Sequence, residues 1–415
     1  MEIHGKLVDI HNQTMFAATV IVEGGRIADI RSNSHRGSHF IVPGFYDAHC
    51  HLENTHMIPS EFARIAVRHG TVSTTFATHH LSNVMREEGM HLLRKNAAHT
   101  PLKCHFPSPT HLPHCSSLCE GRAQHAIGKR ILIHASNLQT LLPLLNEDPR
   151  RCLFSSSHIS ADKFALGHIN LLIKRAIELG MDPIDAITCG TYRDEPDAGL
   201  LRVGDPADLA LVENLESLRV LETYIDGTLV FKGEPLFPRV PFKQLKPIFY
   251  SEVSLQDLRM PATESEVSVL MINKGGPPYE TKQLLPTTDH GECVSDPQRD
   301  LLKLVSIGKG SKPTIQLVEG FELKKGAIAS STSGKLVAVG TSDQDLVAVL
   351  NALAATGGGI AISNHGKTDI LPLPISGLLT QLDGEELALR HIDLQIASKG
   401  FGTADAMTLL LKFIY

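Results

Sequence analysis

Short apolar strand patterns alternate with longer helical patterns along the first half of this chain. Residues 6–10 and 18–22 alternate apolar and polar side chains, and we expect the turn at 23–26 to join these two segments into small antiparallel β structure. Further runs of strand type follow from residue 40, separated by helical stretches. The predicted strands are 40–46, 72–77, 102–106, 130–133 and 152–154, and the predicted helices start at 59 or cover 91–98, 120–127, 138–145 and 169–179. This alternation indicates βα units and a parallel sheet.

The second half of the chain returns to β patterns before a new unit begins. Residues 204–212 and 220–231 have β character and can rejoin the N-terminal β layer. Only five strand candidates precede them, where a closed βα barrel needs about eight, so we expect a shortened barrel. Beyond residue 247, predicted strands at 267–272 and 335–339, a helix at 343–355 and a turn into a strand at 357–363 indicate a separate α/β domain.

These patterns divide the chain into four segments. We expect the N-terminal part of the β layer at 1–40 and the shortened barrel at 41–196. The returning part of the layer is expected at 197–236, and the C-terminal domain at 248–415. The expected fold class is therefore α/β.

Composition narrows the classes of partner. The formal charge is −6, apolar residues make up 42% and charged residues 20%, and no block of Lys and Arg stands out. We therefore expect neither nucleic acid nor membrane as a partner. No run of about 18 apolar residues and no signal-peptide pattern is seen, so a cytoplasmic protein is expected. The seven cysteines are odd in number and scattered, which favours reduced thiols over a disulfide framework.

The segment Asp47-Ala48-His49-Cys50-His51 carries the first candidate chemistry. Two histidines one residue apart on a strand project to the same side, so they can offer two imidazole nitrogens to one metal ion. Strand ends of βα barrels are where active sites are built. The alternative is a pair of packed histidines with no ligand. Asp47 and Glu53 fit an acid or base role, and equally a capping or supporting role beside a ligand.

At this point the sequence resembles the adenine deaminases of the amidohydrolase superfamily. The resemblance runs through 42–53, 59–64, 69–71, 141–147, 167–169 and 204–212, and resumes at 320–331 and 371–378. It implies an amidohydrolase-type βα barrel, a composite β layer and a C-terminal α/β domain of the adenine-deaminase type. The implied reaction is hydrolysis of adenine to hypoxanthine and ammonia by a metal-bound hydroxide, with a carboxylate moving protons. The implied cofactor is a divalent metal, manganese or iron, and the implied partner is a small-molecule purine in adenine catabolism.

The chain departs from the family pattern at the implied metal site. The family's Asp-Pro-His-Glu is replaced here by Ala77-Thr78-His79-His80, which removes a bridging carboxylate. The family's Cys-Thr-Asp-Asp is replaced by Ser155-Ser156-Ser157-His158, and its Arg-Glu-Gly-Ser by Ile133-His134-Ala135-Ser136. After Thr110-His111-Leu112-Pro113, about two or three βα units of family sequence are absent, judged by the usual barrel length. The family's His-Asp-Ser-His run after Ser331 is also missing.

Two interpretations follow from these replacements. In the first, histidines rebuild a metal site, with His49, His51, His79 and His80 as ligands and His114, His134 and His158 as candidate replacement ligands. In the second, the chain is a catalytically inactive relative that binds adenine or a partner subunit. Lost strands leave open sheet edges, so the remaining strands are expected to reclose, to pair with another subunit as in a homodimer, or to leave an unstable chain.

Two other motifs admit a metal or phosphate reading. The run 111–119 holds two histidines and two cysteines, as a zinc site or as the scar of a deletion. Gly357-Gly358-Gly359 is better read as a tight turn than as a phosphate loop, because no Gly-Lys-Ser/Thr follows it.

Overall fold

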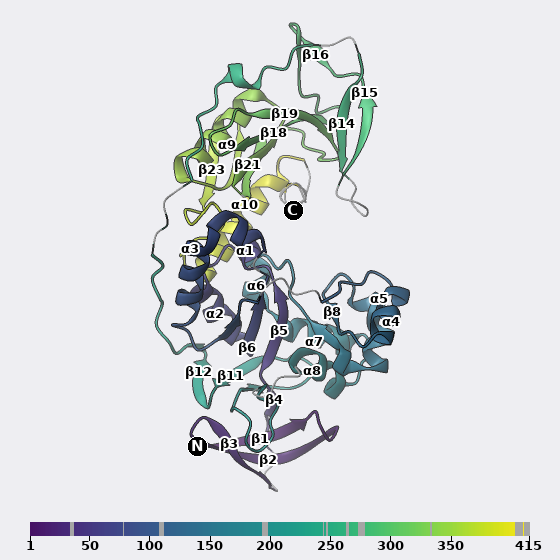
Figure 1. Cartoon of the computed structure of the whole chain (residues 1–415), viewed down its shortest axis with the longest axis vertical. Helices are drawn as coiled ribbons and strands as arrows, with labels where there is room; N and C mark the ends of the chain where they lie inside the picture. Colours follow the sequence, from purple (N-terminus) through teal and green to yellow (C-terminus); the bar gives the residue numbers. More distant parts are fainter. Residues whose placement is uncertain are drawn as a thin grey trace. The chain divides into compact units, whose positions relative to one another are not determined.

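The computed structural model describes most of the chain, and its contacts divide it into two compact units. The described residues are 1–33, 37–77, 79–107, 112–192, 198–243, 245, 248–262, 265–272, 279–332, 334–402 and 410, with the side chains of 79, 80 and 279 left out. Unit 1 comprises Met1–His79, Met90–Phe242 and Gln381–Glu385. Unit 2 comprises His80–Gly89, Lys243–Thr380 and Glu386–Tyr415. Figure 1 shows the elements of both units.

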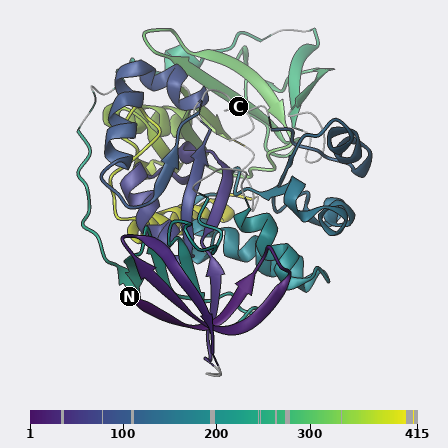
Figure 2. The same ribbon diagram turned by 60° about the horizontal axis from the view of Figure 1, so that its bottom comes forward.

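Unit 1 contains an eight-stranded β layer built from both flanks of the barrel segment. Its strands lie in the order β13-β12-β11-β10-β4-β1-β2-β3. Their bounds are β1 Glu2–Asp9, β2 Thr14–Glu23, β3 Arg26–Ser32, β4 Phe40–Pro43, β10 Leu209–Val212, β11 Val220–Ile225, β12 Thr228–Lys232 and β13 Glu234–Pro235. Figure 2 shows the purple N-terminal strands beside the teal returning strands. The expected composite β layer is present.

One predicted connection in this layer was wrong. The turn at 23–26 joins β2 to β3, with Glu23 paired to Arg26, and does not join the first two strands. Those two strands are joined by residues 10–13, so that Asp9 pairs with Thr14. Alternation of apolar residues gives the strands but not which neighbours a turn connects, because each of the three strands alternates in the same way.

The barrel segment of unit 1 contains five short parallel strands. They are β5 Phe45–Cys50, β6 Thr71–Phe76, β7 Lys103–His105, β8 Ile131–Ile133 and β9 Cys152–Phe154. β5, β6 and β7 pair in that order, and β8 pairs with β9. An isolated parallel bridge joins Cys50 to Ser157, beyond the end of β9, and another joins His114 to Leu132. Neighbouring described strands therefore follow the order β8, β9, β5, β6 and β7, and the bridge at His114 lies on the other side of β8.

The predicted strand 40–46 is in fact two strands. Phe40–Pro43 pairs in the β layer, whereas Phe45–Cys50 belongs to the parallel strands. The break falls at Gly44, where a Cβ atom would lie 2.4 Å from a methyl carbon of Val72. Only glycine allows the backbone to pass that close, so the chain changes sheets there.

Helices lie between these strands. In unit 1 they are α1 Leu52–Thr55, α2 Pro59–Arg68, α4 Leu118–Ala126, α5 Leu138–Glu147, α6 Ala161–Leu166, α7 Ile169–Glu178, α8 Pro183–Thr191 and the 3₁₀ turn η1 Pro149–Arg151. The helix α3 His79–Ala97 is interrupted at Arg86, whose φ is 54°. The apolar faces of α5, α7 and α8 pack with Phe154 and Ile133 into one buried cluster. None of the helices described is long and apolar enough to cross a membrane.

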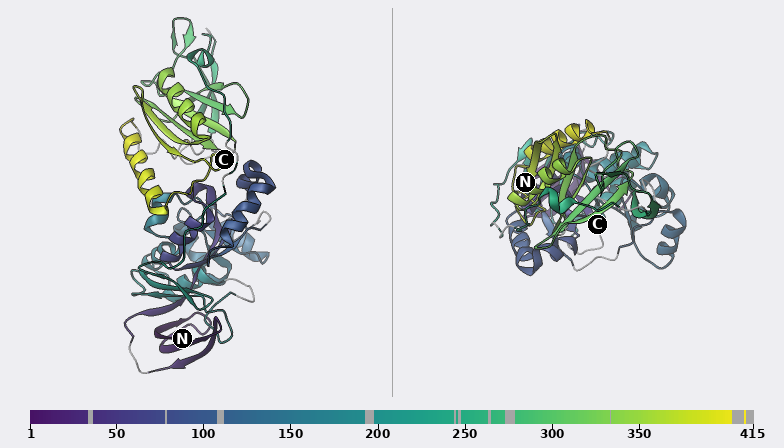
Figure 3. Two further views of the ribbon diagram at one scale, coloured as in Figure 1. Left: turned by 90° about the vertical axis from the view of Figure 1, so that its left-hand side faces the viewer. Right: turned by 90° about the horizontal axis from the view of Figure 1, so that it is seen from above.

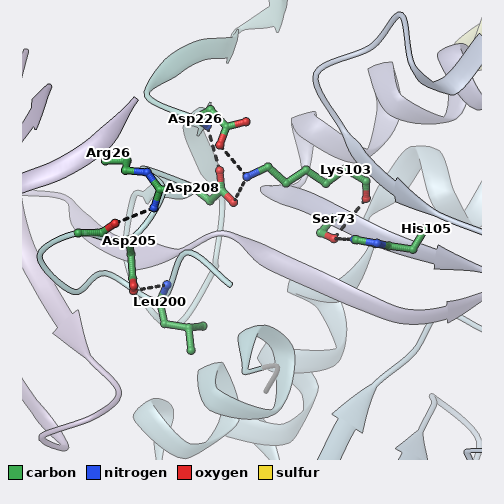
Figure 4. A network of polar contacts seen from close by, with 9 residues as sticks. Arg26, Ser73, Lys103, His105, Leu200, Asp205, Asp208 and Asp226 are labelled. Carbon is green, nitrogen blue, oxygen red and sulfur yellow. Dashed lines mark hydrogen bonds and ion pairs between the residues drawn. The ribbon is translucent and has the colours of Figure 1, made fainter. Parts of the chain in front are cut away.

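A polar network ties β7 to the β layer within unit 1. The Lys103 Nζ atom lies 2.7 Å from a carboxylate oxygen of Asp208 and 2.7 Å from one of Asp226 (Figure 4). Asp208 is fully buried, and burial raises the pKa of its carboxyl while the ion pair with Lys103 lowers it. The Ser73 hydroxyl lies 3.0 Å from Nε2 of His105. The Lys103 ammonium group and the Ser73 hydroxyl are therefore both engaged in structural contacts.

Unit 2 is dominated by a second eight-stranded sheet, in the order β15-β14-β19-β18-β21-β20-β22-β23. Its strands are β14 Val267–Ile272, β15 Tyr279–Leu284, β18 Leu301–Gly308, β19 Thr314–Glu319, β20 Ala327–Thr332, β21 Lys335–Gly340, β22 Gly359–Asn364 and β23 Lys367–Pro372. The hairpin β16 Thr288–Asp289 and β17 Glu292–Cys293, the turn η2 Leu255–Leu258, and the helices α9 Asp343–Thr356 and α10 Gly384–Lys399 complete the elements. Leu346, Val349 and Leu353 of α9 are buried in one cluster with sheet residues of this unit. In Figure 3 the helix α9 lies against the green strands of this sheet.

Candidate metal centre

The paired histidines lie where strand β5 becomes irregular. The parallel pairing of β5 with β6 shifts register between Asp47 and Cys50, so the two residues between them have no partner in the ladder. Irregular pairing of this kind re-aims side chains at strand ends. His49 and His51 are both buried, with 7% and 5% of their surface exposed. The histidine pair thus lies at the carboxyl end of the first barrel strand.

The Nε2 atoms of His49 and His51 face each other at 3.3 Å. The ring centroids are 5.0 Å apart and the rings are nearly perpendicular. Two nitrogens bound at about 2.0–2.1 Å to one tetrahedral ion lie roughly 3.3–3.4 Å apart. The observed separation therefore equals that of two neighbouring ligands on one ion.

Glu53 sets the orientation of His51. One carboxylate oxygen of Glu53, a residue that is 3% exposed, lies 3.3 Å from Nδ1 of His51. A carboxylate accepts a hydrogen bond, so Nδ1 carries the proton and the lone pair of Nε2 points toward His49. Ligating histidines commonly have this arrangement, because the second nitrogen is held by a carboxylate.

Further imidazoles extend this pair into a row, which we call the histidine row: His158, His51, His49, His114 and His134. The ring centroids of successive members are 4.4, 5.0, 5.2 and 5.7 Å apart. The members come from the ends of β5, β8 and β9 and from the bridge at residue 114. Two of the histidines that the sequence offered as replacement ligands, His114 and His158, thus lie against the predicted pair, and His134 lies against His114.

The members of the row differ in their surroundings. His158 is exposed and stacks flat on His51, and its Nδ1 lies 2.8 Å from the side-chain nitrogen of Asn54. An amide NH₂ donates, so Nδ1 of His158 accepts. His114 and His134 line a cavity of about 220 Å³ together with Ser116, Ser136 and Thr140. Nδ1 of His134 lies 2.8 Å from the Ser136 hydroxyl.

Three members of the row, His49, His114 and His134, are held in the neutral form. Burial lowers the pKa of His49 to about 4, and the neighbouring His51 and His114 lower it further while Asp47 raises it. Burial also lowers the pKa of His114 and of His134. A neutral imidazole is the form that binds a metal, so these rings can act as ligands near neutral pH.

A complete ligand set is not assembled in the described part of the chain. Among the residues whose side chains are described, no three His, Cys, Asp or Glu groups lie so as to hold one ion. The side chains of His79 and His80, and the whole of His111, fall outside the described residues. The zinc interpretation of 111–119 is not supported by its cysteines, because Cys115 is buried in the core cluster while Cys119 is exposed. Within the described residues, two side chains, His49 and His51, are therefore placed as neighbouring ligands of one metal ion. Any further ligand must come from other residues.

The sequence did not predict the contacts of the buried carboxylate next to this pair. Asp47 is fully buried, and Nε2 of His168 lies 2.9 Å from its Oδ2. His168 is 121 residues away and opens α7. Its Nδ1 lies 2.7 Å from the Thr71 hydroxyl. The one available signal was the match of 167–169 to the family's motif.

Two family models match this chain. Residues 40–137 match the amidohydrolase family, and residues 280–414 match the adenine deaminase C-terminal domain. The first match contains His49, His51 and His114. The second lies within the C-terminal half that the sequence set apart.

Curated relatives match nearly the whole chain. An adenine deaminase of Salinibacter ruber is 31% identical over 513 residues, covering 99% of this chain and 94% of the relative. An adenine deaminase of Methanosarcina mazei is 29% identical over 511 residues, covering 96% and 92%. The 513 aligned positions exceed the 415 residues of this chain by 98, so at least that many positions hold a residue of the relative alone.

Solved structures of amidohydrolases also match. The N-acetylglucosamine-6-phosphate deacetylase of Thermotoga maritima aligns with a TM-score of 0.40 at 13% identity, covering 56% of this chain and all of that one. A guanine deaminase from C. acetobutylicum aligns with a TM-score of 0.34 at 12% identity, covering 55% and 99%.

Proposed function

The chain belongs to the adenine deaminase family, and from that premise we propose that it hydrolyses adenine to hypoxanthine and ammonia at a centre built on His49 and His51. The substrate is a small-molecule purine, and the reaction belongs to adenine catabolism. The single observation that supports a metal-dependent reaction best is the separation of 3.3 Å between the two Nε2 atoms, with Glu53 holding His51 in the ligating tautomer.

The amidohydrolase family uses a divalent metal, and we propose manganese or iron here. When bound, such a cation lowers the pKa of water toward neutrality and so supplies a nucleophile. Imidazole nitrogen suits iron, whereas manganese prefers carboxylate and carbonyl oxygen. Because the ligands on hand are nitrogens, iron is the better of the two for this chain.

His114 is the best candidate among the replacement ligands. Its ring lies 5.2 Å from that of His49, and rings of neighbouring ligands on a tetrahedral ion have roughly that spacing. His158 is less suited, because it stacks at 7° on His51 and bonds Asn54. His134 contacts His114 and not the pair. His79 and His80 remain proposed ligands on the strength of the family motif alone.

A second candidate function follows from the missing acidic groups. A catalytically inactive relative would bind adenine or a partner subunit without turnover. This alternative rests on the absence of a three-ligand group among the described side chains and on Ser157 and His158, which stand where the family pattern has two aspartates. A homodimer is proposed with either function, because within the described residues the outer edge of β7 pairs with no strand.

The test is metal content and ammonia release measured on the same preparations. The purified chain is incubated with adenine and with Mn²⁺ or Fe²⁺, beside a His49→Ala/His51→Ala double variant. His158→Ala is the matched control, since it removes a histidine of the row that we exclude as a ligand. We expect the wild-type chain to bind metal and to release ammonia. The double variant should lose both bound metal and ammonia release, and the control should retain both.

The outcomes separate the two functions. Stoichiometric metal without ammonia release, together with adenine binding in a calorimeter, supports the inactive relative. Neither metal nor ammonia from a cooperatively folded protein contradicts the enzyme proposal. Equal release from the control and the double variant would show that the reaction does not use this pair.

A further inference from the structure

The end of strand β9 is fastened to the end of β5 by a run of serines. Beyond β9, the Ser157 amide donates to the His49 carbonyl at 2.9 Å, and the His51 amide donates to the Ser157 carbonyl at 3.0 Å. The Ser155 hydroxyl also donates to the His49 carbonyl, at 2.9 Å. Both metal-binding candidates are therefore held through their own backbone by residues more than 100 positions away.

The Asp47 carboxylate accepts the other hydrogen bonds at this junction. Its Oδ1 accepts from the Ser156 amide at 2.9 Å and from the His49 amide at 3.2 Å. Its Oδ2 accepts from the Ser156 hydroxyl and, at 2.9 Å, from Nε2 of His168. The carboxylate thus joins the two strand ends to the start of α7.

Burial makes these donors necessary for the fold of the site. Asp47 is 0% exposed, and a buried carboxylate costs several kcal/mol unless hydrogen bonds and an opposite charge compensate it. His168 is itself 3% exposed, fixed by Thr71 on one side and by the rings of Phe62 and Phe164 on the other. Removing the Ser156 hydroxyl or the His168 ring leaves Oδ2 of Asp47 with one of its two donors.

We propose that Asp47, Ser156 and His168 form a positioning clamp, which holds His49 and His51 at the separation of two metal ligands. None of the three touches the metal or substrate in this role. Their effect is to fix the backbone of residues 47–51 against the segment 155–157, across a junction that is only one bridge wide. The clamp extends the proposed function, but its structural part can be tested without any metal.

The test combines amide hydrogen exchange with metal binding. Ser156→Ala removes one donor at a half-buried position and should fold. His168→Leu removes the imidazole, and His168→Gln keeps an N–H donor toward Asp47. Ser217→Ala, a serine of the same unit far from the site in sequence, is the matched control. Exchange of the amides of His49, His51 and Ser157 is followed by mass spectrometry on the full chain, and binding of Fe²⁺ or Zn²⁺ by calorimetry.

We expect exchange at residues 49–51 and 155–157 to accelerate about tenfold in Ser156→Ala and more in His168→Leu, with strands β1 and β2 unchanged. Metal affinity should fall about 10- to 100-fold in His168→Leu, with partial recovery in His168→Gln. Uniform acceleration over unit 1, or exchange at both segments equal to wild type, would overturn the clamp. If wild type binds no metal, the proposed function fails, while the exchange data still decide the clamp.

Discussion

A half-buried histidine outside the row, with its Nε2 atom fully buried, makes the stability of unit 1 depend on pH. His69 follows α2, and its Nε2 is buried without a hydrogen-bond partner among the described residues. Burial lowers the pKa of His69 from 6.5 to about 4, and the nearby His168 and Arg68 lower it further. The ring of Phe164 lies 6.5 Å from that of His69. The folded state therefore keeps this imidazole neutral.

The sign and size of the effect follow from linkage. Between pH 6.5 and 4 the unfolded chain binds a proton on His69 and the folded chain does not, so the free energy of unfolding falls as the pH falls. The neutral His69 makes its full contribution to the free energy of unfolding above about pH 6.5. At pH 5.0 the loss is about 2 kcal/mol, and it reaches about 3 kcal/mol below pH 4. His49, whose pKa is also about 4, adds a loss of the same sign.

The assay is urea unfolding of wild type and His69→Gln at pH 7.5 and 5.0, followed by circular dichroism. Glutamine is polar and does not titrate, so the variant should lose about 2 kcal/mol less than wild type between the two pH values. His91→Gln, which changes an exposed histidine of α3, is the control and should follow wild type. Equal losses in wild type and His69→Gln would refute the assignment of a buried neutral imidazole at this position.

Three further predictions concern packing and reactivity. Lys303 is fully buried, with its Nζ 2.9 Å from Asp343. In chemical denaturation, Asp343→Ala should therefore lower the free energy of unfolding by about 3–5 kcal/mol, whereas Lys303→Met should cost far less or nothing. Equal losses in the two variants would contradict this prediction. Gly44→Ala should lower the melting temperature, because its Cβ would overlap Val72; an unchanged melting temperature would show that the two strands can separate there. Maleimide labelling of the native chain followed by peptide mapping should modify Cys119, which is exposed, before any buried cysteine, and early modification of a buried one would show local opening.

Much of the fold could be predicted from the chain because its strands are short and clearly bounded. The strand 152–154 and the helix opened by Pro59 are observed at those positions, since a Pro at the first helical turn and an apolar run between charged residues mark boundaries locally. The break at Gly44 was missed because it depends on the approach of Val72, 28 residues later. Local patterns contain no information about that approach.

The candidate site was predictable for its histidines and not for its supports. The pair His49 and His51 is visible because ligands one residue apart on a strand need no knowledge of the rest of the fold. The place of His114 next to them depends on how the chain crosses between strands. The bond between Asp47 and His168 spans 121 residues, and nothing local to either residue announces it. Sequence reasoning named the histidines that we propose as metal ligands and missed the carboxylate contacts that hold them.

The Ser156 amide and hydroxyl help to satisfy the buried Asp47 carboxylate without a metal. A hydroxyl and an amide both donate, so Asp47 is compensated by protein groups alone. The end of the sheet can then fold without a metal, whereas sites whose ligands repel one another fold only with it. We infer that folding and metal binding are separate events in this chain. A well-folded protein without metal would therefore speak against its activity and would not speak against its fold.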